Sequence, residues 1–379
     1  MLRVNVTRSS MPPMEEYFAE VAPLWESRWL TNMGEKHREL EARLRERLGV
    51  EDVCLFANGH LALECAIEAL GLGSDGRDEV VTTPFTFAST THAIVRKGLK
   101  PVFCDVRESD ATIDPEKMES LVTERTCAVL PVHVYGNLCD DASIRRIADA
   151  HGLKVLYDAA HAFGVELFDS VSGEWRSSAS LGDASAFSFH ATKVFNTVEG
   201  GAVCTSSAAL ADALALWRSF GMRGGEDAEV PGGNAKMDEF RAAMGVCNLR
   251  HLDGEIAKRA AVERRYRENL AGVRGARLVE PEDGVRPNHA YMPVFLGEDL
   301  GASRDDVLGA LASRGFGARR YFCPCTNEMP WAKGAFDPGD TPVARRLSRQ
   351  VLCLPMYADL ALEDVDAICE IVCSRGKDA

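Results

Sequence analysis

The stretch Ser188-Phe189-His190-Ala191-Thr192-Lys193 decides the fold class. It completes an apolar run, Ala184 to Phe189, that favours a β-strand, and it precedes Glu199 to Val203, which is typical of the entry to another strand. Such a strand places a hydroxyl and an amine at the edge of a sheet, where open α/β folds bind ligands. A partly desolvated lysine has a lowered pKa and can form a Schiff base with an aldehyde. A single lysine is usually a solvated surface residue, so this interpretation depends on its companions.

Three other stretches favour the same chemistry. A short apolar strand ends in Asp158, and His161 follows three residues later. A carboxylate there can keep the pyridinium nitrogen of pyridoxal phosphate (PLP) protonated. Asn58-Gly59 lies between a strand and the helical run Leu61 to Leu70, where free N–H groups and the helix dipole favour a phosphate. Pro84 to Thr90 forms an aromatic-bearing loop. Together the four stretches, in this order, indicate a PLP site.

These motifs resemble the PLP-dependent nucleotide-sugar aminotransferases of the DegT/DnrJ/EryC1/StrS family. The resemblance runs from about Trp29 to Tyr357, and the similarity is greatest to the branch that aminates carbon 4 of dTDP-4-keto-6-deoxyglucose. It implies an α/β protein of PLP fold type I (aspartate-aminotransferase-like). Residues 1–240 would form N-terminal helices and a large PLP-binding domain with a mainly parallel sheet, and residues 241–379 a linker helix and a smaller C-terminal α/β domain. The motifs are Asn58-Gly59, Thr86 to Thr90, Pro131 to Gly136, Asp158 to His161, Ser188 to Lys193, Glu199 to Ala202 and Gly233 to Met237.

The resemblance assigns the cofactor ring to four residues. Lys193 would be the Schiff-base lysine and the proton shuttle, and Asp158 would pair with the pyridinium nitrogen. Asp158 could instead be a helix N-cap, because Ala159-Ala160 could open a helix. His161 would lie near the ring hydroxyl, and Phe87 would stack on the ring face. Phe85 is a close rival of Phe87, and His161 could be a packed histidine.

The phosphate would be held by Asn58, Gly59, His60 and Ser188. The family usually has threonine where His60 stands, so a backbone amide would serve there in place of a side-chain hydroxyl. Asn234 resembles the residue that this family donates from the neighbouring subunit, which implies a homodimer with shared active sites. Gly232-Gly233-Asn234 is also a strong turn signal on its own.

Two further segments would contact the substrate. An arginine fork suits a diphosphate, so Arg319 or Arg320 would bind it in the sugar-nucleotide cleft while the other forms a surface salt bridge. Which arginine does so stays open at this point. Tyr321 belongs to the same segment, and His133 and Tyr135 are assigned to substrate binding with it.

The implied reaction is a ping-pong transamination. L-Glutamate, the family's usual donor, would convert PLP to pyridoxamine phosphate, which would then aminate carbon 4 of dTDP-4-keto-6-deoxy-D-glucose to give a dTDP-4-amino-4,6-dideoxyhexose for deoxysugar or antibiotic assembly. Amination at carbon 3, or of a UDP-sugar or scyllo-inosose, stays open, as does a non-catalytic PLP-binding regulatory protein. Lys193 argues against the family's 3-dehydratase branch, in which histidine replaces the lysine.

Composition excludes several other functions. A net charge of −14 over 379 residues argues against electrostatic binding to nucleic acid or to an anionic membrane. No apolar run reaches 18 residues and no signal peptide is evident, so we expect a cytoplasmic protein. The twelve cysteines form no pair of C-x-x-C knuckles, so we expect no metal site.

The order of predicted elements supports the fold. Strands and helices alternate from residue 53 to Asp158, which predicts a parallel sheet. After Asp158 the strands follow without intervening helices, so some pairing there should be antiparallel. Met14 to Trp29 should be helical, with a kink or break at Pro23. In the C-terminal domain, Ala318 to Tyr321 is predicted as a strand.

Overall fold

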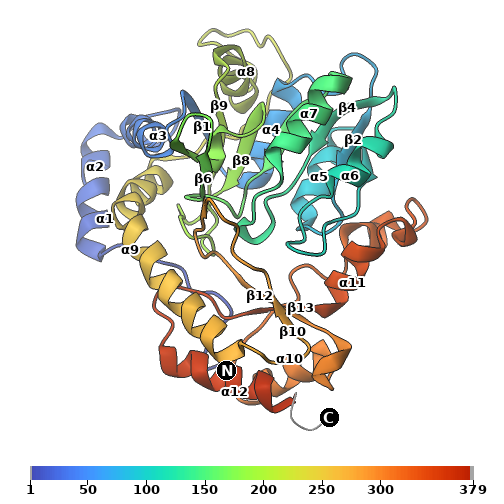
Figure 1. Ribbon diagram of the computed structural model, residues 1–379. Helices are drawn as coiled ribbons and strands as arrows, with labels where there is room; N and C mark the ends of the chain where they lie inside the picture. The colour runs from blue at the N-terminus through green and yellow to red at the C-terminus, as the bar shows by residue number, and fades with distance from the viewer. Residues whose placement is uncertain (1, 376–379) are drawn as a thin grey trace.

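A seven-stranded sheet forms the centre of the larger part of the molecule (Figure 1). The computed structural model describes residues 2–375. Six of the seven strands run in one direction, and β9 is antiparallel to both of its neighbours, which confirms the antiparallel pairing predicted after Asp158. In spatial order the strands are β1 (Asp52–Phe56), β9 (Gly201–Thr205), β8 (Ala184–Ser188), β5 (Lys154–Asp158), β4 (Thr126–Leu130), β2 (Glu79–Thr82) and β3 (Lys100–Phe103).

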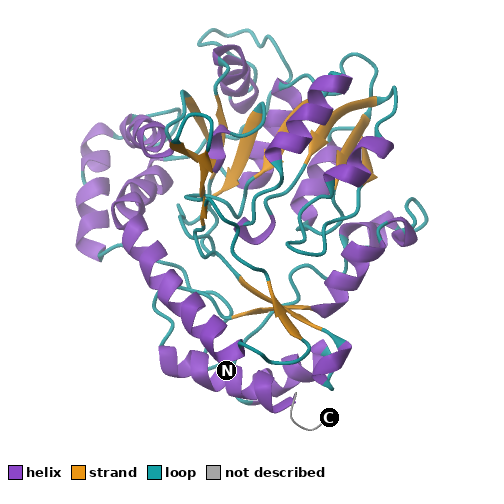
Figure 2. Ribbon diagram, viewed as in Figure 1, coloured by secondary structure: helices purple, strands orange, loops and turns teal. Residues whose placement is uncertain are grey.

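Helices cover both faces of this sheet (Figure 2). Side chains alternate along β5, so Leu156 packs into the apolar cluster with α4, whereas Val155 and Tyr157 pack into the cluster with α7. Asp158 therefore belongs to the α4 and α5 face. The helices and short 3₁₀ turns of this part are α4 (Gly59–Ala69), α5 (Ala88–Arg96), α6 (Pro115–Met118), η1 (Glu119–Leu121), η2 (Val134–Gly136), α7 (Asp141–His151), η3 (Ser178–Ser180) and α8 (Ala208–Arg218).

Four helices lie along one side of the molecule, and the longest of them connects its two parts (Figure 1). The predicted break at Pro23 is confirmed: one helix ends at Val21 and the next starts at Pro23, because proline is favoured at the first helical position and disrupts a helix interior. The longest of the four, with 32 residues, starts at the N-cap Asp238 and runs from the large sheet to the C-terminal part. The helices are α1 (Met14–Val21), α2 (Pro23–Ser27), α3 (Glu35–Leu48) and α9 (Glu239–Leu270).

The C-terminal part contains a three-stranded antiparallel sheet with its own apolar core. The strand predicted over Ala318 to Tyr321 is wrong: only an isolated bridge between Arg319 and Cys353 forms there. The elements are β10 (Ala276–Leu278), β12 (Met292–Leu296), η4 (Glu298–Leu300), α10 (Arg304–Ser313), η5 (Thr326–Glu328), η6 (Pro330–Ala332), η7 (Pro338–Asp340), α11 (Pro342–Gln350), β13 (Val351–Leu354) and α12 (Leu362–Arg375).

The N-terminal arm also packs on this C-terminal part. Val4 is buried in its core, and the backbone N–H groups of Arg3 and Val4 donate to the Gly315 carbonyl at 2.8 and 3.1 Å. We retain a division of the chain near residue 240 as a proposal, with the arm lying against the second unit.

A small third sheet connects the two parts. The hairpin β6 (Glu166–Asp169) and β7 (Glu174–Ser177) pairs with β11 (Val285–Arg286), which lies just before β12. The segment that leads into the C-terminal sheet is therefore attached to the large part immediately after Asp158 and His161.

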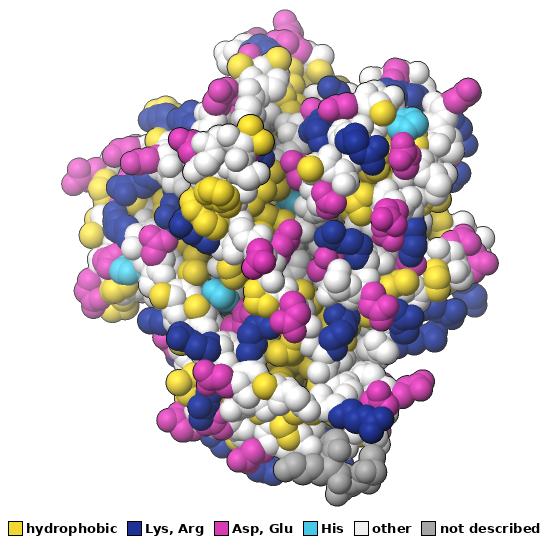
Figure 3. Space-filling model, in the orientation of Figure 1, with side chains coloured by type: hydrophobic (Ala, Val, Ile, Leu, Met, Phe, Trp, Pro, Cys, Tyr) yellow, Lys and Arg dark blue, Asp and Glu magenta, His cyan; other side chains and the backbone are white. Residues whose placement is uncertain are grey.

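Positive and negative side chains are interspersed over the face of the molecule in Figure 3. Among residues 2–375, no helix is both long enough and apolar enough to cross a membrane.

Candidate active site

Three strand ends bring the predicted cofactor residues together. Asp158 closes β5 and pairs in register with Ala186 of β8, which itself ends at Ser188. Gly201 of β9 pairs with both Ser188 and Phe56, so the ends of β1 and β8 lie at the same edge of the sheet, on either side of β9. The carboxyl edge of the sheet thus collects Asp158, Ser188 and the turn after β1, as the sequence predicts.

The turn after β1 forms a cradle at the N-terminus of α4. The Asn58 side chain caps the helix by accepting a hydrogen bond from the Leu61 N–H at 2.9 Å. A Cβ on Gly59 would lie 2.8 Å from the Ser188 Cβ, and one on Gly201 would lie 2.7 Å from the Asn58 carbonyl carbon. Only glycine allows these close approaches. The first-turn N–H groups and the helix dipole then face the Ser188 hydroxyl, a donor set that fits a phosphate.

The His60 ring is held to the side of this cradle. Its Nδ1 lies 2.9 Å from the Ser89 hydroxyl of α5, and its Nε2 lies 3.2 Å from Glu64. Because both ring nitrogens already have partners, the backbone N–H is the group of His60 left for a phosphate, and this contact stays a prediction.

Asp158 is buried and points into the same space. Its Oδ2 accepts a hydrogen bond from the Thr90 hydroxyl at 2.7 Å, and its Oδ1 accepts one from the Ala160 N–H at 3.1 Å. Thr86 lies 2.8 Å from the Thr90 hydroxyl and fixes its direction. Burial raises the pKa of Asp158, while Thr90 and Ala160 favour the ionised form. A buried carboxylate of this kind suits a protonated ring nitrogen as a partner.

Lys193 extends from the loop after β8. Its Nζ donates a hydrogen bond to the Tyr291 hydroxyl at 3.2 Å. Burial lowers the pKa of Lys193 to about 8, although the charge of Asp158 acts in the opposite direction. A substantial fraction of the amine is therefore neutral near physiological pH and able to attack an aldehyde.

Phe85 and Phe87, the two candidates for stacking on the cofactor ring, lie in different environments. Phe85 is fully buried and packs edge-on against Tyr135 and Phe322, so it belongs to the core. Phe87 is 60% exposed, directly before α5, with its ring centroid 6.4 Å from that of Phe322. Of these two rivals, only Phe87 is free to stack on a ligand.

His161 is buried below this site in a fixed orientation. Its Nδ1 accepts a hydrogen bond from the Tyr135 backbone N–H at 3.0 Å, so the ring proton is on Nε2. Its ring is nearly parallel to that of Phe322, with 5.8 Å between centroids. Burial and the charge of Lys193 lower the pKa of His161 well below its usual value, so the ring stays neutral.

His133 and Tyr135 lie in different environments. His133 is fully buried, and its ring stacks on Tyr157 at 4.4 Å, on the α7 face of the sheet. Its Nδ1 accepts from the Cys139 N–H at 3.1 Å, and burial lowers its pKa to about 3. The structure thus places His133 in the core, on the face opposite to that of Asp158. Tyr135 lies beside His161, and its hydroxyl donates to the Tyr321 carbonyl.

The two arginines before Tyr321 point in different directions. Arg320 forms an ion pair with Asp305 at 3.0 Å. The Arg319 guanidinium lies over the Tyr321 ring at 5.8 Å, and that ring lies 6.1 Å from the Tyr291 ring beside Lys193. The arrangement favours Arg319 as the arginine of the substrate cleft.

Asn234 lies in an exposed segment beside the cradle. The next residue, Ala235, accepts a backbone hydrogen bond from Ala57 at 2.8 Å. The Asn234 side chain is exposed and makes no hydrogen bond within residues 2–375. Its contribution to a neighbouring subunit stays a proposal.

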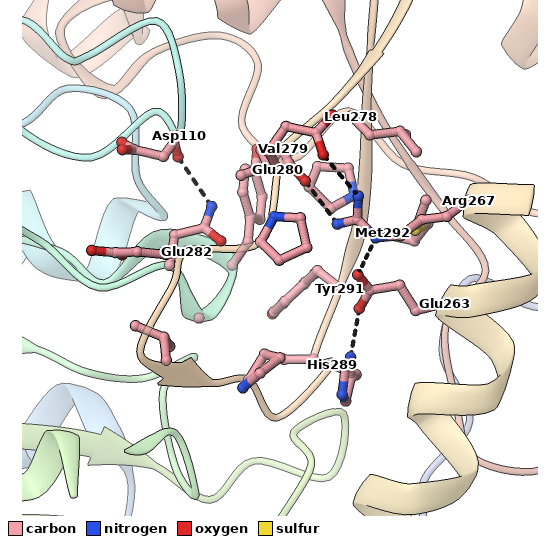
Figure 4. A pocket seen from close by; sticks show the side chains of 18 of the residues that line it. Asp110, Glu263, Arg267, Leu278, Val279, Glu280, Glu282, His289, Tyr291 and Met292 are labelled. Atoms are coloured by element: carbon pink, nitrogen blue, oxygen red, sulfur yellow. Dashed lines mark hydrogen bonds and ion pairs between the residues drawn. The ribbon is translucent and has the colours of Figure 1, made fainter. Parts of the chain in front are cut away.

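A separate cleft of about 880 Å³ lies behind Tyr291, between α9 and the segment 276–293 (Figure 4). Its wall carries a chain of ion pairs: His289 to Glu263 at 2.6 Å and Glu263 to Arg267 at 2.7 Å. Tyr135, Asn288 and Tyr291 line this cleft on the side of the lysine.

Two residues of the site were not identified from sequence. Thr90 belongs to a motif that was recognised, but its bond to Asp158 depends on how α5 packs on β5. Tyr291 lies 98 residues after Lys193 and has no local sequence signal.

Comparison with known proteins identifies the family. The model of the DegT/DnrJ/EryC1/StrS aminotransferase family matches residues 13–373. A protein of Shigella dysenteriae named dTDP-4-amino-4,6-dideoxy-D-glucose transaminase is 38% identical over 365 residues, which cover 96% of this chain and 97% of that protein. A Micromonospora megalomicea protein named dTDP-3-amino-3,4,6-trideoxy-alpha-D-glucose transaminase is 33% identical, with 90% of this chain and 89% of that protein covered. The crystal structure of DesI with its TDP-sugar product superposes with a TM-score of 0.91 at 33% identity, covering 99% of this chain and 93% of that chain.

The fold and the site together define an aminotransferase of fold type I. The chain belongs to the DegT/DnrJ/EryC1/StrS aminotransferase family. The fold class and the family predicted from the sequence are thereby confirmed.

Proposed function

We propose that this enzyme uses PLP to transfer an amino group from L-glutamate to carbon 4 of dTDP-4-keto-6-deoxy-D-glucose, giving a dTDP-4-amino-4,6-dideoxyhexose and 2-oxoglutarate. The observation that carries the proposal is the convergence of Lys193, Asp158 and the α4 cradle at one sheet edge. The name of the Shigella relative supports carbon 4 as the position of the new amine.

Different residues of this chain would bind different parts of the cofactor. When bound, PLP supplies an aldehyde that bonds to amines and a ring that accepts electrons from the reacting carbon. Asn58, the backbone amides of Gly59 and His60, and Ser188 would hold its phosphate. Asp158 would keep the ring nitrogen protonated, because a buried carboxylate held by Thr90 stabilises a cation beside it.

Lys193 would carry the cofactor and then move a proton. Its lowered pKa, about 8, lets one amine act as a nucleophile when neutral, accept a proton from the substrate carbon and return it. A lysine with an ordinary pKa would remain protonated and could not act as a base near neutral pH.

The sugar nucleotide would bind beside Tyr321. Arg319 can bind a diphosphate with two parallel hydrogen bonds, since its guanidinium is free of the ion pair that occupies Arg320. A local arginine is needed because the overall charge of −14 repels an anionic substrate.

A homodimer would complete the site. Two large aromatic side chains are exposed: Trp25 is 67% exposed on α2, and Phe220 is 47% exposed in the segment that leads to Asn234. A second subunit in this position would bring Asn234 to the phosphate of its neighbour.

Visible absorption of the PLP-loaded protein tests the proposal through two additions. Glutamate should bleach the band of the lysine-bound cofactor, and dTDP-4-keto-6-deoxyglucose should restore it. Bleaching without recovery would refute the assigned acceptor while leaving the aminotransferase intact. If no lysine-bound band forms at all, the role of Lys193 is wrong and the binding-protein alternative is favoured.

The second candidate is amination at carbon 3. The relative from Micromonospora, whose name specifies a 3-amino sugar, is the observation that favours it. A dTDP-3-keto-6-deoxyhexose would then restore the absorption band faster than the 4-keto sugar.

A further inference from the structure

The Lys193 side chain makes one hydrogen bond within residues 2–375, and its partner lies 98 residues later in the sequence. The acceptor is the Tyr291 hydroxyl, 3.2 Å from Nζ, in the residue directly before β12. We propose that Tyr291 is a positioning residue that holds the free amine of Lys193 ready for proton transfer. This inference rests on the proposed role of Lys193.

The backbone around Tyr291 is anchored on both sides. The Asn288 amide donates to the His161 and Phe163 carbonyls at 2.8 and 2.9 Å, which attaches the segment to the loop after Asp158. His289 pairs with Glu263 of α9 at 2.6 Å (Figure 4). Two anchors within three residues leave the Tyr291 backbone little freedom to move away from the lysine.

The Tyr291 ring is also confined. Its centroid lies 4.7 Å from the His161 ring, 5.8 Å from Tyr135 and 6.1 Å from Tyr321. These contacts enclose the ring on several sides and direct its hydroxyl to Nζ. The large cleft of Figure 4 lies behind it, so Tyr291 is also part of the wall between that cleft and the lysine.

A tyrosine hydroxyl suits this task because it both donates and accepts hydrogen bonds. It can accept from the ammonium of Lys193 and donate to the neutral amine, so the lysine keeps one position in both protonation states. Burial raises the pKa of Tyr291 far above its usual value, and the nearby Arg259 lowers it by less, so the hydroxyl stays neutral. Phenylalanine would keep the ring and lose this function.

The test measures the lysine in the protein without cofactor. Acylation of Lys193 is followed by peptide mass spectrometry as a function of pH, which reports the neutral fraction of the amine. Three other titratable groups surround it, Asp158, His161 and Tyr321, and none of them is changed. Wild-type protein should be labelled with a midpoint near the pKa of about 8.

Tyr291→Phe should move this midpoint down by about one pH unit, because hydrogen bonds to a charged group are about twice as strong as those to a neutral one. Tyr291→Leu also lacks the hydroxyl and should shift the midpoint in the same direction. Tyr266→Phe is the matched control, since Tyr266 is a fully buried tyrosine whose hydroxyl has no partner within residues 2–375. It should leave the midpoint unchanged.

The outcomes separate the two levels of inference. An unchanged midpoint in folded Tyr291→Phe protein would overturn the role of Tyr291 and leave that of Lys193 standing. A wild-type midpoint as high as that of an ordinary surface lysine would instead contradict the proposed function, because it would remove the premise of a reactive amine.

Discussion

Thr90→Val removes one hydroxyl and keeps the shape of the side chain. In the native protein that hydroxyl donates to Asp158 at 2.7 Å, and both residues are buried. The Ala160 N–H is the only other hydrogen bond to this carboxylate within residues 2–375. The variant should fold, but it should lose one of two bonds that favour ionised Asp158.

The magnitude follows from the strength of that bond. A hydrogen bond to a charged group contributes about 1.5–3 kcal/mol, which is roughly 10- to 100-fold in the ionisation equilibrium of Asp158. Burial already raises the pKa of this carboxyl, and the variant raises it further. As the pH falls, the variant therefore loses the negative charge of Asp158 at a higher pH than the wild-type protein does. We expect PLP to bind about tenfold more weakly to the variant in mild acid, and with nearly wild-type affinity in mild alkali.

Absorbance titration of the cofactor-free protein with PLP across this pH range measures the effect. Thr91→Val is a matched control, because Thr91 is equally buried and its hydroxyl bonds to Thr326 at 2.9 Å, away from Asp158. Equal affinity profiles for the two variants, or a loss at Thr90 that does not change with pH, would refute the role assigned to Thr90 and Asp158.

Three further predictions concern the cradle, the substrate cleft and the partner subunit. Gly59→Ala places a Cβ 2.8 Å from that of Ser188, so it should lower the free energy of unfolding by about 1–3 kcal/mol, measured by denaturant titration, and weaken PLP binding. An unchanged unfolding midpoint would contradict this close approach. Arg319→Ala should raise the KM for the sugar nucleotide by about tenfold or more through loss of a bidentate contact, whereas Arg320→Ala should change it by less than about twofold; the reverse order would exchange their roles. Chains with Asn234→Asp and chains with Lys193→Ala, each inactive alone, should regain activity when mixed, and a mixture that stays inactive would argue against shared sites.

Local sequence was sufficient to predict where the residues at the strand ends lie. Asp158 and Ser188 each close an apolar strand, and Asn58-Gly59 lies between a strand and a helix, so a parallel sheet necessarily brings them to one edge. Side chains alternate along β5, so Tyr157 lies on the face opposite to that of Asp158, and His133 stacks on Tyr157 there. The sequence motif alone did not reveal this.

Features that depend on contacts distant in sequence were not predicted. The hairpin β6–β7 has short strands with little burial, and β6 pairs with β11, more than a hundred residues later. Tyr291 reaches Lys193 only because Asn288 and His289 attach its segment to two other elements. The choice between Arg319 and Arg320 required the position of Asp305, which pairs with Arg320 only once α10 is folded.

The most direct test of the whole account is to incubate the PLP-loaded enzyme with ¹⁵N-labelled glutamate and dTDP-4-keto-6-deoxyglucose, and to locate the label in the product by NMR. The account predicts that the nitrogen is bonded to carbon 4 of the sugar. Label at carbon 3, or no label in any nucleotide sugar, would contradict it.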